Sequence, residues 1–142
     1  MTLINLENIY KLQKELDTKF ELEFNYTPKE LVDQRTLALI VELSELANEI
    51  AFFKYWKKNK NLNQDKINEE FVDGIHFFAS LAIYYNLNSS LESKIVDKDL
   101  TIQFLNIYKN VGKFIEKKDS FYLKQAFSLF LGLINLIGMN VK

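Results

Sequence analysis

The sequence predicts an all-α fold, a bundle of about five helices. Helix breakers are scarce, since the 142 residues include four Gly and one Pro, and apolar residues recur at spacings of three and four along most of the chain. Apolar residues make up 48% of the composition and aromatic residues 14%, which supplies a hydrophobic core and argues against disorder. We expect a single domain over residues 1–142, in which helices pack on helices.

Two helices are predicted in the first third of the chain. An apolar stripe from Leu6 to Phe20 indicates the first helix. The tetrapeptide TPKE (27–30) is typical of a helix start, because Thr can cap, Pro suits the first helical position and Glu can reach back as in a capping box. Neither Gly nor Pro follows until Gly74, so we expect the second helix from Pro28 to about Phe53.

Three more helices and two loops complete the predicted order of elements. The loops are the polar stretches rich in Asn, with Lys in one and Ser in the other. These segments are a loop at Lys54–Asp65, a helix at about Lys66–Tyr85, a loop at Asn86–Asp97, and helices at about Lys98–Glu116 and about Ser120–Gly138.

The composition argues against several partners and locations. A net charge of −1 without a basic block argues against nucleic acid. Cys is absent, which excludes disulfides and thiolate metal sites and fits a reducing, cytoplasmic location. Residues 1–17 lack the apolar run of a signal peptide. The apolar run Phe127–Met139 is shorter than the roughly 18–20 residues that span a bilayer, so we expect no membrane partner.

The same apolar run, FSLFLGLINLIGM (127–139), is expected in a buried helix or in a dimer interface. The Phe and Tyr content of the last two predicted helices exceeds what the core of a small monomer needs. We therefore predict a homodimer.

Four acidic residues carry the functional hypothesis. They form two pairs, ELSE (42–45) and EFVD (70–73), with the acids of each pair three residues apart. On a helix this spacing places both carboxylates on one face, one turn apart. Both pairs lie in apolar surroundings, where acids are costly unless compensated. Two such helices side by side would bring together a site for a hard divalent cation such as Mg²⁺, made of Glu42, Glu45, Glu70 and Asp73.

A solvated acidic edge is the alternative, and it is the usual fate of a single ExxE pair. Two pairs in apolar surroundings favour the metal site, because like charges one turn apart repel and a bound dication would keep all four acids ionised. Carboxylates on Mg²⁺ are typical of phosphate chemistry, in which a free carboxylate can take the proton of the attacking water. No P-loop pattern is present, so Lys54, Lys57 and Lys58 are expected to hold phosphates, unless they form a solvated basic loop.

The acids and the residues around them resemble the all-α nucleoside triphosphate pyrophosphatases, which include the MazG proteins and the dimeric dUTPases. The segments LQKELD (12–17), VELSELANEIAFFKYW (41–56) and EEFVDGIHFFASLAI (69–83) are similar to the dimeric dUTPase branch. MazG-like sequences share the acids but generally lack the FKYW and DGIHF segments. The resemblance extends over about residues 9–85.

The resemblance implies Mg²⁺-dependent hydrolysis of dUTP between the α- and β-phosphates, giving dUMP and pyrophosphate, with dUDP accepted as well. It implies that the four acids bind Mg²⁺ and that Glu45 orients or deprotonates the attacking water. Positions that contact uracil and deoxyribose in the family match Gln13, Trp56 and His76. With Lys54 and Lys57, these residues form the predicted substrate site, and Asp17 and Glu49 are second-tier candidates.

Each of these residues has another interpretation. Trp56 could cap the core, although an aromatic face near a nucleotide site is a natural stacking platform. His76, the only His, could be a satisfied core group, and Gln13 could be an ordinary surface residue. Asp17 stands where many relatives are expected to carry Asn, and a carboxylate lacks the amide donor. Glu49 could be a further metal ligand or an ion-pair partner of a lysine.

Two other functions remain open. One is a MazG-like pyrophosphohydrolase that acts on other or modified nucleotides without a preference for uracil. The other is a non-catalytic, nucleotide-binding helical dimer, because the chain ends at Gly138–Lys142 without the Lys-, Asn-, Arg- and Tyr-rich arm of the family. The C-terminal arm is therefore expected to be missing, and the metal site is expected to survive that loss.

Overall fold

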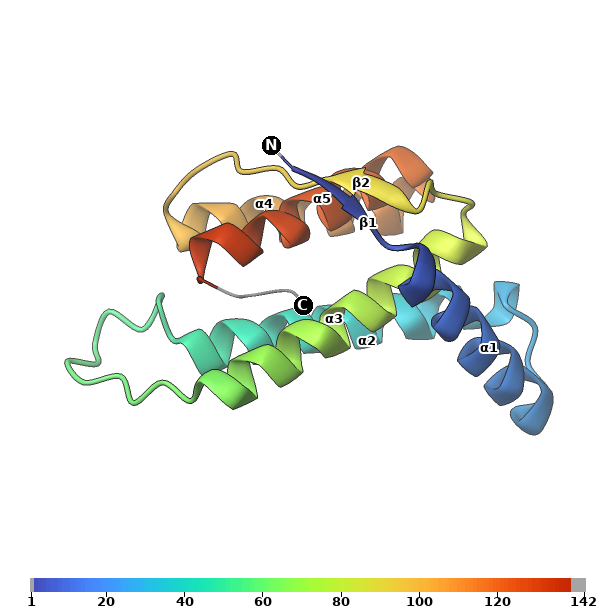
Figure 1. The fold of residues 1–142 in the computed structure, drawn as a ribbon, viewed down its shortest axis with the longest axis horizontal. Coiled ribbons are helices and arrows are strands. Elements are labelled where there is room, and N and C mark those ends of the chain that lie inside the picture. Colours follow the sequence, from blue (N-terminus) through green and yellow to red (C-terminus); the bar gives the residue numbers. More distant parts are fainter. Residues whose placement is uncertain (1, 139–142) are drawn as a thin grey trace.

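The structure, a computed structural model, describes residues 2–138 and confirms the all-α class. Within this range, five α-helices carry the fold and two short strands form one small sheet (Figure 1). Met139 of the predicted apolar run and the chain end at 140–142 lie outside the described residues. The elements are β1 (Leu3–Asn5), α1 (Glu7–Phe24), α2 (Val32–Ile50), α3 (Gln64–Tyr84), β2 (Ser90–Glu92), α4 (Leu100–Lys117) and α5 (Ser120–Leu136).

Two helix pairs stack on each other. Helices α2 and α3 lie side by side as one pair, and α4 and α5 form the other (Figure 1). Helix α3 contacts α5 and α2 contacts α4, so the hydrophobic core fills the space between the two pairs. Helix α1 packs against α3 and projects from one end of the molecule (Figure 1).

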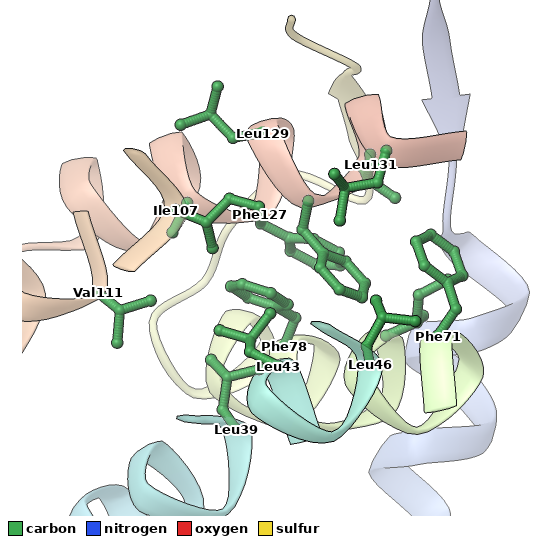
Figure 2. Packing of buried hydrophobic residues seen from close by; sticks show 14 of the residues in the cluster. Leu39, Leu43, Leu46, Phe71, Phe78, Ile107, Val111, Phe127, Leu129 and Leu131 are labelled. Carbon is green, nitrogen blue, oxygen red and sulfur yellow. The ribbon is translucent and has the colours of Figure 1, made fainter. Parts of the chain in front are cut away.

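Aromatic rings connect α3 to α5 in this core. Phe71 stacks on Phe130 with ring centroids 4.6 Å apart, and Phe78 stacks on Phe127 at 4.8 Å. Such ring pairs contribute beyond the apolar area that they bury. Buried leucines of α2 pack beside the rings (Figure 2), and they are Leu39, Leu43 and Leu46. This packing fixes α2 and α3 relative to each other, and with them the acidic side chains that they carry.

The apolar run of α5 lies inside the protein's own core. Phe127, Phe130, Leu131 and Leu133 are fully buried, which confirms the expectation of a buried helix for this run. The expectation that these residues exceed the needs of one core is wrong for α5. Exposed apolar side chains lie elsewhere, including Leu12 and Leu22 of α1, Leu37 of α2 and Leu105 of α4. Among the described helices, none combines the length and the apolar character needed to cross a membrane.

The helix starts follow the capping signals of the sequence. The predicted capping box forms: Thr27 N–H donates to Glu30 Oε1 at 3.2 Å, and Glu30 N–H donates to Thr27 Oγ1 at 3.3 Å. The chain then makes a 3₁₀ turn, Lys29–Leu31, before α2 begins at Val32 rather than at Pro28. Helix α2 also ends earlier than predicted, at Ile50, because Ala51 adopts a left-handed conformation with φ 60°.

The sequence did not predict the small sheet. Strand β1 pairs antiparallel with β2, with Leu3 opposite Glu92, where a loop was expected over Asn86–Asp97. Three residues are too few for the alternating pattern that identifies a strand. The sheet ties the N-terminal segment to the segment after α3, and Leu6 N–H donates to Ser89 O at 2.6 Å just before α1 begins. It therefore determines where α1 starts and how it meets α3.

Gly74 offers a test of the packing between α3 and α5. A Cβ at Gly74 would lie 2.6 Å from Phe130 Cζ, whereas a Cβ at Gly112, in α4, would meet no atom within 4 Å. Gly74→Ala should therefore lower the free energy of unfolding by about 1–3 kcal/mol through overpacking. The control Gly112→Ala should raise it by about 1 kcal/mol, since Ala favours a helix over Gly. Urea unfolding measures both, and equal gains would mean that α3 and α5 are not closely packed here.

Candidate metal centre and its neighbouring pocket

Three of the four predicted acids meet between α2 and α3. Glu42 and Glu45 of α2 and Glu70 of α3 each offer a carboxylate oxygen, and these three oxygens lie within 4.8 Å of one another. The spacing of three residues along α2 and the packing of α2 against α3 together produce this arrangement. A group of carboxylate oxygens at this separation is a suitable donor set for a hard divalent cation.

The three acids differ in exposure. The side chain of Glu70 is buried at 4% exposure, Glu42 is partly buried and Glu45 is exposed. The expectation that both pairs lie on apolar faces therefore holds for Glu70 but is wrong for Glu45, which lies at the open rim of the group. A molecule from solvent can reach the three acids from the side of Glu45.

Two carboxylate oxygens of the group lack a hydrogen-bond partner. Glu42 Oε2 and Glu70 Oε2 are buried, and no donor among the described residues reaches either atom. A buried carboxylate oxygen without a partner is costly. A proton shared between the two carboxylates, or a cation bound between them, would remove this cost. The donor set therefore fits a divalent metal ion.

The acids shift one another's pKa values. Burial, a shared hydrogen bond with Glu70 and the charges of Glu45 and Asp73 raise the pKa of Glu42 to about 7. A hydrogen bond with Glu70, followed by burial, also raises the pKa of Glu45. Burial would raise the pKa of Glu70, but hydrogen bonds from Lys66, Glu42 and Glu45 outweigh it, and the net shift is downward. Without a metal, these shifts favour a proton on Glu42 and the negative charge on Glu70.

Lys66 supplies a positive charge that the sequence interpretation missed. Its Nζ lies 3.1 Å from Glu70 Oε1, one turn away on α3, and 3.7 Å from Glu69 Oε2. The hydrogen bond with Glu70 raises the pKa of Lys66. A Lys four residues before a Glu on a helix was a signal in the sequence for this pair. Lys66 compensates Glu70, but it leaves the two unpartnered oxygens unsatisfied.

Asp73, the fourth predicted ligand, does not belong to the group of three oxygens. It lies one turn after Glu70 on α3 and is partly buried. Burial, then the charges of Glu70 and Glu69, raise the pKa of Asp73. Asp73 also lines a neighbouring pocket, so it connects the acids to that pocket.

The pocket has a volume of about 480 Å³ and lies between α1, α3 and the start of α2. This is a typical size for a site that takes a small molecule. One part of its wall is apolar and largely aromatic, and it consists of Leu16, Phe20, Phe24, Tyr26, Leu31 and Phe77. The polar part consists of Gln13, Asp17, Arg35, Asp73, His76 and Ser80.

The pocket brings together four residues that the sequence singled out, Asp73 and the three connected residues Gln13, Asp17 and His76. Gln13 Nε2 donates to Asp17 Oδ1 at 2.8 Å and to Ser80 Oγ at 3.0 Å, and Gln13 Oε1 lies 2.7 Å from His76 Nδ1. Gln13 is 6% exposed, so it is not an ordinary surface residue. Arg35, the only Arg in the chain, was missed as a site residue, and no motif of the sequence pointed to it.

The other predicted substrate residues lie apart from the pocket. Lys54, Trp56 and Lys57 belong to the segment between α2 and α3, which forms the end of the molecule opposite α1 (Figure 1). Trp56 is 60% exposed and packs edge-on against Tyr55, so it does not cap the core. Glu49, one turn beyond Glu45, is not among the three acids whose oxygens meet.

Comparison with known proteins points to one family. A family model described as dUTPase matches residues 5–142. No curated protein and no solved structure matches the chain significantly. The acids and the polar residues of the pocket all lie within the range that the family model matches.

The raised pKa of Glu42 predicts how stability depends on pH. A carboxyl whose folded pKa is about 7 instead of 4.5 binds its proton more tightly in the folded state, so its contribution to stability is present below pH 4.5 and is lost as the pH rises through 7. In metal-free protein, Glu42→Gln should therefore raise Tm at about pH 8. It should also reduce the fall in Tm between pH 4.5 and about 7.

Thermal unfolding in a chelating buffer, recorded across this pH range, measures the effect. Glu15→Gln, which removes an exposed acid of α1, is the control and should keep the pH dependence of the unsubstituted protein. A Glu42→Gln variant with an unchanged pH profile would show that Glu42 does not hold a proton in this range.

Proposed function

The chain belongs to the all-α dUTPase family, whose members hydrolyse dUTP, and from this premise we propose that it cleaves dUTP to dUMP and pyrophosphate with the help of Mg²⁺. The observation that carries the proposal is the group of three carboxylates with two unpartnered buried oxygens, next to a pocket of suitable size for a nucleoside. Acceptance of dUDP is part of the proposal.

The residues of α3 provide an order for the parts of the substrate. Glu70, Asp73, His76 and Ser80 follow one another at intervals of about one turn, or roughly 5 Å along the helix axis. Glu70 belongs to the acidic group, and the other three line the pocket. We place the phosphates at the acids, the deoxyribose near Asp73, and the base beside His76 and Gln13 against the aromatic wall.

We assign Glu42, Glu45, Glu70 and Asp73 as the ligands of Mg²⁺. When bound, Mg²⁺ would neutralise phosphate charge and lower the pKa of a bound water. Glu45 is exposed at the rim and its pKa is raised, which suits a base that takes the proton of the attacking water. The water oxygen bonds to the α-phosphorus. The bond from that phosphorus to the oxygen that bridges the α- and β-phosphates then breaks, and pyrophosphate leaves.

We propose that the segment between α2 and α3 approaches the acids when substrate binds. In that position Lys54 and Lys57 contact phosphates and Trp56 covers the nucleotide. Glu49 and Asp17 remain secondary candidates. We also propose a homodimer, and the exposed apolar side chains of α1 and α2 support it, among them Leu12, Leu22 and Leu37.

Asp17 favours a second candidate function. Its carboxylate contacts Arg35 and Gln13 and supplies no amide donor to a base. A MazG-like enzyme that hydrolyses a wider set of nucleotides would tolerate Asp at position 17, where the dUTPase resemblance leads us to expect Asn. A binding protein without turnover would keep the same pocket and acids.

Pyrophosphate release from dUTP tests the proposal, with dTTP, dCTP and UTP assayed separately as alternative substrates. Cleavage of dUDP is measured by its release of phosphate, and each reaction is run with and without Mg²⁺. Mg²⁺-dependent cleavage selective for dUTP and dUDP supports the dUTPase reading. Cleavage of all the triphosphates would identify a broader pyrophosphohydrolase. Nucleotide and Mg²⁺ binding without cleavage would identify a binding protein.

Glu45→Gln should lower kcat for dUTP on the order of 100-fold or more, since Gln cannot accept the proton of water. Circular dichroism should show an unchanged helical fold, because Glu45 is exposed. Glu15→Gln, which neutralises an exposed acid of α1, is the control and should keep the rate within about threefold, as surface changes have small effects. A Glu45→Gln variant with the rate of the unsubstituted protein would contradict the role of Glu45.

A further inference from the structure

The polar wall of the pocket is one connected series of contacts, Arg35 to Asp17 to Gln13 to His76. We propose that Arg35 and Asp17 are positioning residues that act through Gln13 to keep the proton of His76 on Nδ1, so that Nε2 is left as the hydrogen-bond acceptor that reads N3–H of a uracil base. The reading of the base rests on the proposed function, whereas the state of His76 does not.

The series begins with a partly buried cation. Arg35 Nη2 lies 2.8 Å from Glu21 Oε2 and 3.7 Å from Asp17 Oδ1, and the Arg35 side chain is 13% exposed. A guanidinium stays charged in proteins and only donates hydrogen bonds. The carboxylate of Asp17, at 14% exposure beside this charge, accepts a hydrogen bond from Gln13.

The carboxylate determines which way the amide of Gln13 points. Only the nitrogen end of the amide can donate to Asp17 Oδ1, at 2.8 Å, and the same nitrogen donates to Ser80 Oγ at 3.0 Å. Both hydrogens of the amide are then used. A flipped amide would place the oxygen of the buried Gln13 against a carboxylate oxygen of Asp17, and the two acceptors would repel each other. The oxygen of Gln13 must therefore face His76.

The orientation of the amide then determines the tautomer of His76. Gln13 Oε1 accepts only, so the contact of 2.7 Å requires a hydrogen on His76 Nδ1. A neutral imidazole with its hydrogen on Nδ1 has a free lone pair on Nε2. Because His76 lines the pocket, this nitrogen is the acceptor that the ring offers to a ligand.

An acceptor at this place distinguishes the two natural pyrimidine patterns. Uracil carries a hydrogen on N3 and can donate it to Nε2, whereas N3 of cytosine is itself an acceptor and would face the lone pair. A site built around one hydrogen bond discriminates strongly against an analogue that leaves a buried polar group unpaired. Thymine has the same N3–H as uracil, so this contact does not reject dTTP.

Nitrogen-15 NMR of the ligand-free protein tests the tautomer directly. His76 is the only His, so its two ring nitrogens need no further assignment. At about pH 8, above the pKa of an ordinary imidazole, the spectrum should show a protonated Nδ1 and an unprotonated Nε2. Gln13→Met removes the acceptor and should move the hydrogen to Nε2. A spectrum of the unsubstituted protein with the hydrogen on Nε2 would overturn the proposal.

Two matched variants test the positioning role of Arg35 and Asp17. Asp17→Leu and Glu21→Gln each remove one carboxylate from Arg35, but only Asp17 contacts Gln13. Leu is chosen because Asn could still accept from Gln13. Asp17→Leu should reduce the population with the hydrogen on Nδ1, and Glu21→Gln should not. If the two variants give the same tautomer ratio, Asp17 does not position His76.

Binding of the non-cleavable α,β-imido analogues of dUTP and dCTP tests the reading of the base without turnover. The ratio of their Kd values should favour the dUTP analogue in the unsubstituted protein, and Gln13→Met should lower this ratio on the order of tenfold. An unchanged ratio in Gln13→Met would overturn the assignment of Nε2 as the reader of N3–H. If the tautomer and the preference for the dUTP analogue are observed but no pyrophosphate is released from dUTP, the result counts against the proposed function alone.

Discussion

The close approach of three carboxylates between α2 and α3 is the constraint on which the site depends. Glu42, Glu45 and Glu70 repel one another, and the fold cannot separate them, because the helices that carry them are fixed by the core behind. Phe71 and Phe78, which stack on α5, come from the same helix as Glu70. The repulsion is relieved by a proton, by Lys66 in part, or by a cation. A cation bound at these atoms would therefore also change the stability of the fold.

Helix α3 serves three environments with one sequence. Phe71 and Phe78 face the core, Glu70 faces the acids of α2, and His76 and Ser80 face the pocket beside α1. The position of α1 depends in turn on the small sheet, which ties residues 3–5 to the segment after α3. Long-range pairing of two three-residue strands thus determines the shape of a pocket whose polar groups come from helices.

The sequence predicted the features that depend on residues close together in the chain. Helical periodicity gave the five helices, the TPKE capping box was correct, and the spacing of the acids placed three of four together. It could not give contacts that depend on the packing of distant segments. Arg35 of α2 contacts Asp17 of α1, which lies 18 residues earlier in the chain (35 − 17). No sequence motif indicates this contact. The pairing of β1 with β2 likewise joins segments that are distant in the sequence.

Water-proton relaxation of bound Mn²⁺ tests most directly whether the acids and the pocket form one site. Mn²⁺ is a paramagnetic substitute for Mg²⁺, and both prefer oxygen ligands. Mn²⁺ should bind the unsubstituted protein, α,β-imido-dUTP should tighten its binding and change the relaxation enhancement, and Glu70→Gln should abolish both effects. Nucleotide binding that is equally tight with and without Mn²⁺, or unchanged Mn²⁺ binding in Glu70→Gln, would contradict a metal centre built on these carboxylates.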